Sequence, residues 1–149
     1  MPEEQQAKTV QLSGEDLSRM HQAEQGKLQA LGERANSIQR ILMDQLAAID
    51  ALKELKSEKE GNILVPLGAG TFIEAKVGNV EKVKSSVANN VMVEMEIPKA
   101  IEKLEKNSEQ TKKELEELQK EQNIVLNNIA GIENIFAAAR KQMQQKGKE

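Results

Sequence analysis

Side chains that could carry out chemistry are scarce in this chain of 149 residues. It has one histidine, His21, and no cysteine, so it offers no thiol nucleophile and no cysteine-based zinc site. The glycine-rich segment Gly68-Ala69-Gly70 lacks the Gly-Lys-Ser/Thr ending of a phosphate-binding loop. No pair of carboxylates stands in the apolar setting that acid–base catalysis requires. We therefore expect no enzyme, no cofactor and no metal, and we interpret His21 as a surface or packing residue.

The composition excludes further classes of protein. Charged residues make up 30% of the chain and aromatic residues 1%, so a compact core built on aromatic side chains is not available. Lys and Arg number 21 against 24 Asp and Glu, which gives a net charge of −3 and argues against nucleic-acid binding. The polar start, the absence of a long apolar run and the lack of cysteine predict a cytoplasmic protein that does not bind membranes.

The first long helix is predicted over residues 14–60. Ser13 and Asp16 have the spacing of a capping box at its start. Its inner positions alternate in steps of three and four, as in a coiled coil. These positions are Leu28, Leu31, Ala35, Ile38, Leu42, Gln45, Ile49 and Leu52. Ile41, Leu46 and Leu55 widen this apolar stripe.

The second helix is predicted over residues 98–146, beginning at Pro98. The same steps run through Ile101, Leu104, Ser108, Thr111, Leu115, Leu118, Gln122, Val125, Ile129, Ile132, Phe136, Ala139 and Met143. We expect an antiparallel coiled coil in which residues whose numbers total about 156 lie at the same height. Gln45 then faces Thr111, and this polar pair either fixes the alignment of the helices or is merely tolerated.

The segment 61–97 predicts a small β part. Four short apolar runs, at 63–67, 71–77, 80–87 and 91–97, are separated by turn signals. Gly78-Asn79 is a two-residue link of the kind that closes tight hairpins, and Pro66 favours an edge or a strand end. The two helices are occupied with each other, so the apolar face of each strand must be covered by other chains. The residues predicted to make these oligomer contacts are Ile63, Val65, Leu67, Phe72, Ile73, Ala75, Val77, Val91, Val93 and Met95.

This order of helix, two β-hairpins and helix, without catalytic residues, resembles the alpha-class subunit of prefoldin over about residues 13–145. The detailed match lies in Ile63-Leu64-Val65-Pro66-Leu67-Gly68, Phe72-Ile73-Glu74-Ala75-Lys76-Val77 and Val91-Met92-Val93-Glu94. The resemblance implies one subunit over residues 1–149, mainly α with a small β part. Its long antiparallel two-helix coiled coil would carry two central hairpins that join an intersubunit β-barrel.

The resemblance also implies a function and partners. Two alpha subunits would assemble with four beta subunits into a hetero-hexamer. That assembly would act as an ATP-independent chaperone, or holdase, for unfolded proteins. It would pass them to a group II chaperonin.

The free ends of the helices are the predicted client-binding site. Antiparallel packing brings both chain termini to one tip, where the heptad partners match poorly and flexible methionines are present. The candidate contact residues are Leu12, Leu17, Met20, Ile132, Ile135, Phe136 and Met143. These side chains could instead simply close the coiled coil, and for Ile132 and Phe136 this alternative stays open.

Glycines interrupt both helices near this tip. Gly26 and Gly32 lie in the first helix, and Gly131 lies in the second at the height of Gly26. Each lowers helix stability by roughly 1 kcal/mol relative to alanine. They predict a soft joint beyond which the tip can open, and close packing of the two backbones is the alternative.

Two other functions fit the same pattern. The chain could polymerise through its hairpins into a structural filament. It could also act as a tether between two partners, but that function favours polar, sealed tips, unlike Phe136 and Met143.

Overall fold

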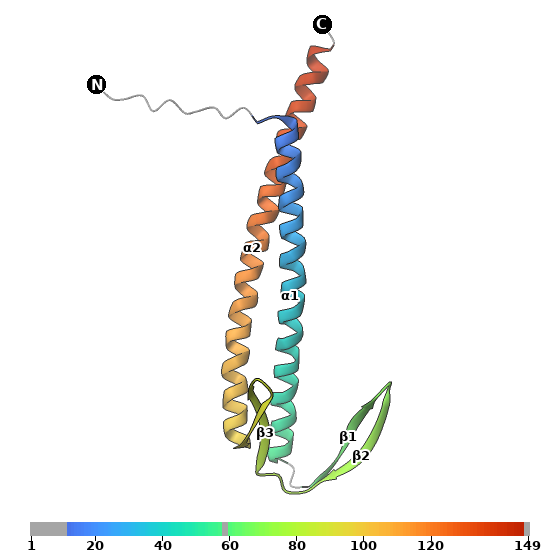
Figure 1. The fold of residues 1–149 in the computed structure, drawn as a ribbon, viewed down its shortest axis with the longest axis vertical. Coiled ribbons are helices and arrows are strands. Elements are labelled where there is room, and N and C mark those ends of the chain that lie inside the picture. Colours follow the sequence, from blue (N-terminus) through green and yellow to red (C-terminus); the bar gives the residue numbers. More distant parts are fainter. Residues whose placement is uncertain (1–11, 58–59, 148–149) are drawn as a thin grey trace, which may run out of the picture. The chain divides into compact units, whose positions relative to one another are not determined.

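The computed structural model describes residues 12–57 and 60–147 of the chain. The predicted order of helix, four strands and helix is confirmed (Figure 1). The elements are α1 (Gly14–Ser57), β1 (Gly61–Gly68), β2 (Thr71–Val77), β3 (Lys82–Ala88), β4 (Val91–Glu96) and α2 (Ile97–Lys146). Within the described ranges, no helix is both long enough and apolar enough to cross a membrane.

The chain divides into two compact units. One, which we call the terminal unit, combines the described parts of 1–36 and 117–149. The other, the hairpin unit, is Ser37–Glu116 and includes all four strands. Each unit contains a stretch of both helices.

The predicted capping box begins α1. The Ser13 hydroxyl accepts a hydrogen bond from the Asp16 amide at 3.1 Å and donates one to the Asp16 carboxylate at 2.6 Å. The same carboxylate accepts the Ser13 amide at 3.2 Å. These bonds satisfy amide groups that have no partner inside the helix. They also lower the pKa of Asp16 from its ordinary value, because they favour the charged form.

In the terminal unit the heptad seam is buried as predicted. Leu31 packs inward from α1, and Leu118 and Val125 do so from α2, where Val125 is 1% exposed. The seam also continues toward the start of α1 through half-buried polar residues. Glu24 accepts a hydrogen bond from Asn128 at 3.1 Å, and His21 lies 3.2 Å from Glu133. The two residue numbers of each pair add up to a value within about four of the predicted 156. This agreement confirms antiparallel packing in this unit.

The seam of the hairpin unit contains a polar layer. Ile38, Ile49 and the polar Ser108 are buried, as predicted for inner positions. The Ser108 hydroxyl donates to the Glu105 carbonyl of its own helix. Thr111 likewise donates to Asn107, so its hydroxyl proton is not available to Gln45. The buried Gln45 Oε1 has no hydrogen-bond partner among the described residues.

The flanks of this seam are open. Ile41 and Leu46, predicted to widen the stripe, are exposed, while Leu55 is half-buried. Lys53 and Glu105 form an ion pair between the helices at 3.2 Å. Because both side chains are half exposed, this ion pair contributes little stability.

The strands form two separate antiparallel hairpins, β1–β2 and β3–β4. The expected tight turn at Gly78-Asn79 is therefore wrong, since β2 and β3 do not pair and this link joins two sheets. The turns lie at 68–70 and 89–90, where turn signals also separate the predicted runs. There Gly68, Ala69, Gly70, Asn89 and Asn90 all have positive φ, a conformation that glycine and asparagine accept readily.

Two predicted boundaries shift at the root of the second hairpin. β3 begins at Lys82 rather than Val80, and Ile97 opens α2 rather than ending a strand. The Ile97 amide donates to the Glu81 carbonyl at 3.2 Å, and its side chain is 2% exposed. Ile97 thus anchors the start of α2, which explains why the helix begins one residue before Pro98.

Candidate functional site

The terminal unit exposes the far end of α2. Its seam face is buried up to Ile132 and half-buried at Phe136, but Ala139 and Met143 are exposed, contrary to the heptad prediction. For Met143 the reason is length, because α2 continues to Lys146 beyond the start of α1 at Gly14 (Figure 1). The last turns of α2 therefore present an apolar stripe that extends past the described start of α1.

The seven predicted client residues divide by accessibility. Leu17 and Ile132 are buried in the seam and could reach a client only if the helices separate. Phe136 is half-buried. The exposed members are Leu12, Met20, Ile135 and Met143, the last of which is 77% exposed. The client-binding role of all seven stays a prediction.

A cavity of about 380 Å³ opens beside Phe136. Its other lining residues are His21, Glu133, Ala137 and Arg140. The His21 ring and the Glu133 carboxylate lie 3.2 Å apart, so they form a charged contact when the ring is protonated. The histidine therefore helps to join the two helices at a point where an apolar seam residue would pack more tightly. Its polar character is why an apolar pattern does not reveal it.

The glycines of the terminal unit do not mark a close approach of backbones. A Cβ atom added at Gly26 or at Gly131 would meet no atom within 4 Å. At Gly32 it would meet only the Gln122 side chain, at 3.8 Å, an ordinary contact. The close-packing alternative is thus wrong for Gly26 and Gly131, and the soft joint stays a prediction.

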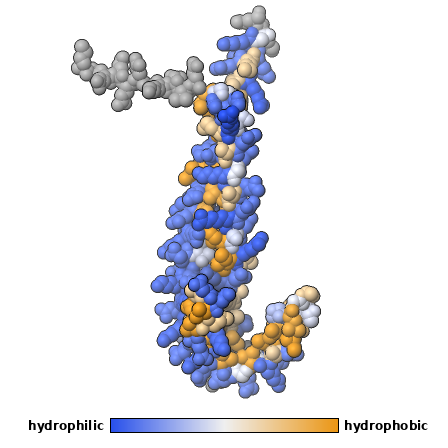
Figure 2. All heavy atoms as spheres, viewed as in Figure 1, coloured by the Kyte–Doolittle hydropathy of each residue, from blue (hydrophilic) through white to orange (hydrophobic). Residues whose placement is uncertain are grey.

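The β1–β2 hairpin is the second apolar surface. Figure 2 shows hydrophobic side chains gathered on it. The register pairs Val65 with Ile73 and Ile63 with Ala75, which places all four on one face with Val77. Ile63 and Ile73 are exposed and the other three half-buried.

The opposite face of this hairpin is mixed. Near the root, Asn62 donates to Glu74 across the strands at 2.9 Å. Near the turn, Leu64 and Phe72 are exposed, Leu64 by 68%. Leu64 was not among the predicted contact residues, because alternation assigns its position to a polar face. Its apolar type, within the apolar run 63–65, was the signal that could have included it.

The β3–β4 hairpin is held against its own helix. The Lys103 ammonium donates to the Ser85 hydroxyl at 3.3 Å and to the Ser86 carbonyl at 3.1 Å. Val83 and Met95 are half-buried on that face. Val91 and Val93, predicted contact residues, remain exposed. So do Met92 and Val87, which were not predicted.

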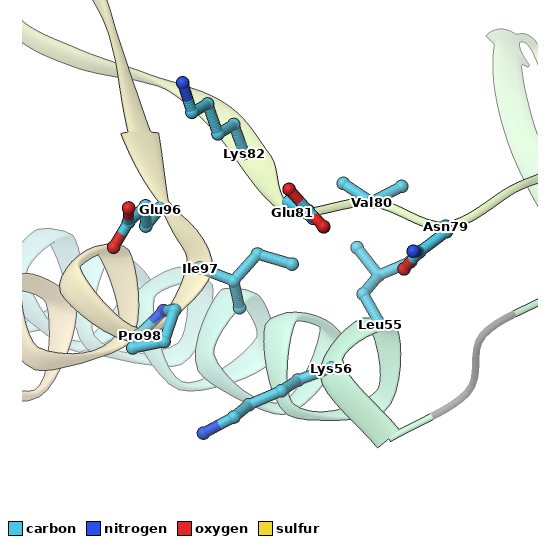
Figure 3. Close-up of a pocket in the computed structure, with 9 residues that line it drawn as sticks. All are labelled: Leu55, Lys56, Asn79, Val80, Glu81, Lys82, Glu96, Ile97 and Pro98. Carbon is cyan, nitrogen blue, oxygen red and sulfur yellow. The ribbon is translucent and has the colours of Figure 1, made fainter.

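Two cavities lie at the roots of the hairpins and share Leu55. One, of about 370 Å³, places Leu55, Val80 and Ile97 around an apolar floor (Figure 3). Lys56, Lys82, Glu81 and Glu96 also line it. The other, of about 490 Å³, has Ala51, Ile63 and Val77 among its apolar lining residues. Both can accept apolar side chains, and no cluster of three metal-binding residues exists in the described part of the chain.

Comparison with known proteins adds independent findings. The model of the prefoldin subunit family matches residues 24–142. Prefoldin subunit alpha of Methanococcus vannielii is 33% identical over 128 residues, covering 80% of this chain and 84% of that protein. That of Methanococcoides burtonii is 30% identical, covering 86% and 94%.

Other similarities agree with these. A Methanococcus maripaludis prefoldin subunit alpha is 37% identical over 84 residues, which is 57% of its own length. Among solved structures, a filamentous PFD from Methanocaldococcus jannaschii superimposes with a TM-score of 0.53 at 22% identity. That match covers 85% of this chain and 98% of the other, and it supports the fold.

Proposed function

Because this chain belongs to the prefoldin alpha-subunit family, a family of chaperones that assemble with other prefoldin subunits, we propose that it is a subunit of an ATP-independent holdase. It captures unfolded polypeptides at the free end of its helix pair and delivers them to a group II chaperonin. It performs no catalytic step and needs no cofactor. Its place of action is the cytoplasm.

We propose that the hairpins make the assembly. The observation that supports this is the apolar face of β1–β2, on which Ile63 and Ile73 remain exposed. Beta subunits would cover this face and complete a shared β-barrel, with two alpha and four beta subunits. An uncovered apolar sheet of this kind is otherwise prone to aggregation.

The observation that carries the holdase function is the accessible apolar stripe at the end of α2. Ile135 and Met143 are exposed there, and Met20 is exposed on α1 in the same unit. Unbranched methionine side chains adapt to many shapes, which suits binding to unrelated unfolded chains.

The test is suppression of aggregation of a chemically unfolded client, with the native mass measured on the same sample. Ile135→Ser with Met143→Ser should weaken suppression without changing the mass, because both side chains are exposed. Ile41→Ser with Met43→Ser is the matched control, since these are also exposed residues, of the same types, in the hairpin unit. Capture at the tip is contradicted if both variants lose suppression of aggregation equally, or if neither variant loses it.

A filament built through the hairpins is the second candidate. The outward faces of β1–β2 and β3–β4 would serve a second copy of this chain as well as a beta subunit. Native mass separates the two: a discrete particle of about six chains with a second subunit supports the hexamer. Long polymers of this chain alone would contradict the hexamer and support the filament.

A further inference from the structure

The last turns of α2 continue a face that is buried elsewhere in the terminal unit. Val125 and Ile132 lie on this face against α1, and Phe136 and Met143 follow at helical spacing. Residues at the same height have numbers with a nearly constant total, as His21 and Glu133 confirm. On this rule the partner of Met143 would precede Gly14, where α1 begins. We call residues 137–146, which begin level with the first turn of α1 and continue past it, the α2 overhang; every one of them is exposed.

The α2 overhang is basic, although the whole chain carries a net charge of −3. It contains Arg140, Lys141 and Lys146 and no acidic residue. None of the three forms an ion pair with another residue that the structure describes. A cation in the last turn complements the helix dipole, which accounts for Lys146 but not for Arg140 or Lys141, further back.

Three acidic side chains that the structure describes at this end of the terminal unit already have partners. Glu133 lies 3.2 Å from His21, and Glu15 accepts a 2.6 Å hydrogen bond from Arg19. Asp16 accepts the hydrogen bonds of the capping box. The positive charge of the α2 overhang is therefore not neutralised from α1, and it is available to an incoming carboxylate.

We infer that the α2 overhang selects client segments that combine apolar side chains with acidic ones. Phe136, Arg140 and Met143 are spaced four and three residues apart, so they lie along one face of the helix. An apolar client residue contacts Phe136 and Met143 while a neighbouring carboxylate reaches the Arg140 guanidinium, which suits it geometrically. This inference rests on the proposed function and adds a substrate class to it.

Two fluorescent peptides test the inference. They share one apolar sequence and differ only in flanking residues, glutamate in one and lysine in the other. The full-length chain, in the assembly that it forms, should bind the glutamate-flanked peptide about fivefold more tightly, as expected for a few exposed charge contacts. Raising the salt concentration from about 50 mM to about 500 mM should remove this difference by screening.

Variants place the preference on the α2 overhang. Arg140→Gln with Lys141→Gln and Lys146→Gln should bring both peptides to the same affinity. Lys99→Gln with Lys112→Gln and Lys113→Gln changes the net charge equally at exposed positions of the hairpin unit and should keep the preference.

Two results would overturn the inference and leave capture intact: equal binding of both peptides by the wild-type chain, or a preference that survives the overhang substitutions. A failure of the proposed function has a different signature. In that case neither peptide binds and an unfolded protein client is not held either.

Discussion

Replacing Gly26 and Gly131 by alanine should stiffen the terminal unit and reduce client capture. Both glycines lie inside helices, and a Cβ at either position meets no atom within 4 Å, so alanine fits without strain. Each substitution then gains about 1 kcal/mol of helix stability, or about 2 kcal/mol for the pair. If opening requires these residues to leave the helix, the open population falls about 30-fold.

The assay combines two measurements on the same double variant. Amide hydrogen exchange in the terminal unit should slow by up to that factor, and suppression of client aggregation should weaken in parallel. Ser37→Ala with Asn107→Ala is the control, because it raises helix propensity at exposed sites of the hairpin unit. The control should leave both readouts of the terminal unit unchanged.

Two results would refute the soft joint. Exchange that does not slow would mean that the glycines do not limit opening. Slower exchange with undiminished capture would mean that clients bind the closed helix pair, through its exposed residues only.

Three further changes have defined outcomes. The Ser13 hydrogen bonds lower the pKa of Asp16 below 3.8. The Asp16 carboxylate therefore stabilises the start of α1 fully above that value, and this stabilisation is lost as the pH falls through the lowered pKa. Circular dichroism from about pH 5 to pH 2 should show an acid-dependent loss of helix that Asp16→Ala removes. Gln45→Leu should raise the free energy of unfolding by about 1 kcal/mol in urea titrations, because it removes a buried oxygen without a partner; a drop would mean that the amide fixes the alignment. Lys103→Met should speed amide exchange in β3–β4 and leave β1–β2 unchanged, since it deletes two hydrogen bonds but keeps the apolar stem; equal acceleration in both hairpins would exclude a local anchor.

The apolar spacing was sufficient to predict the helices and their seam. Leu31, Leu118 and Val125 are buried because a three-four repeat places one side of a helix against its partner. The same rule does not mark His21 or Glu24, which occupy seam positions with polar side chains, although His21 is interpreted as a surface or packing residue on other grounds. Met143 continues the repeat but is exposed, in line with the poor match of heptad partners that the sequence predicts at this tip.

The candidate surfaces were harder to predict. Alternation identified the apolar face of β1–β2 but not Leu64 on the other face. Gly78-Asn79 has the composition of a tight turn, yet pairing is decided by which strands share a register, and the paired strands are joined at 68–70 and 89–90. The hold of Lys103 on β3–β4 depends on a contact between residues 17 and 18 positions apart, which no local pattern specifies.

The two hairpins differ in how they are held by the rest of the chain, and this difference affects the order in which they bind partner subunits. Lys103 keeps β3–β4 close to α2, so that hairpin reaches a partner in a fixed orientation and loses little conformational entropy on binding. β1–β2, whose apolar face remains open, offers the larger hydrophobic gain per encounter. We expect β1–β2 to make the first, less oriented contact and β3–β4 to lock the geometry afterwards. A newly synthesised subunit is then most vulnerable to aggregation in the interval before β1–β2 is covered, which favours synthesis close to its partners.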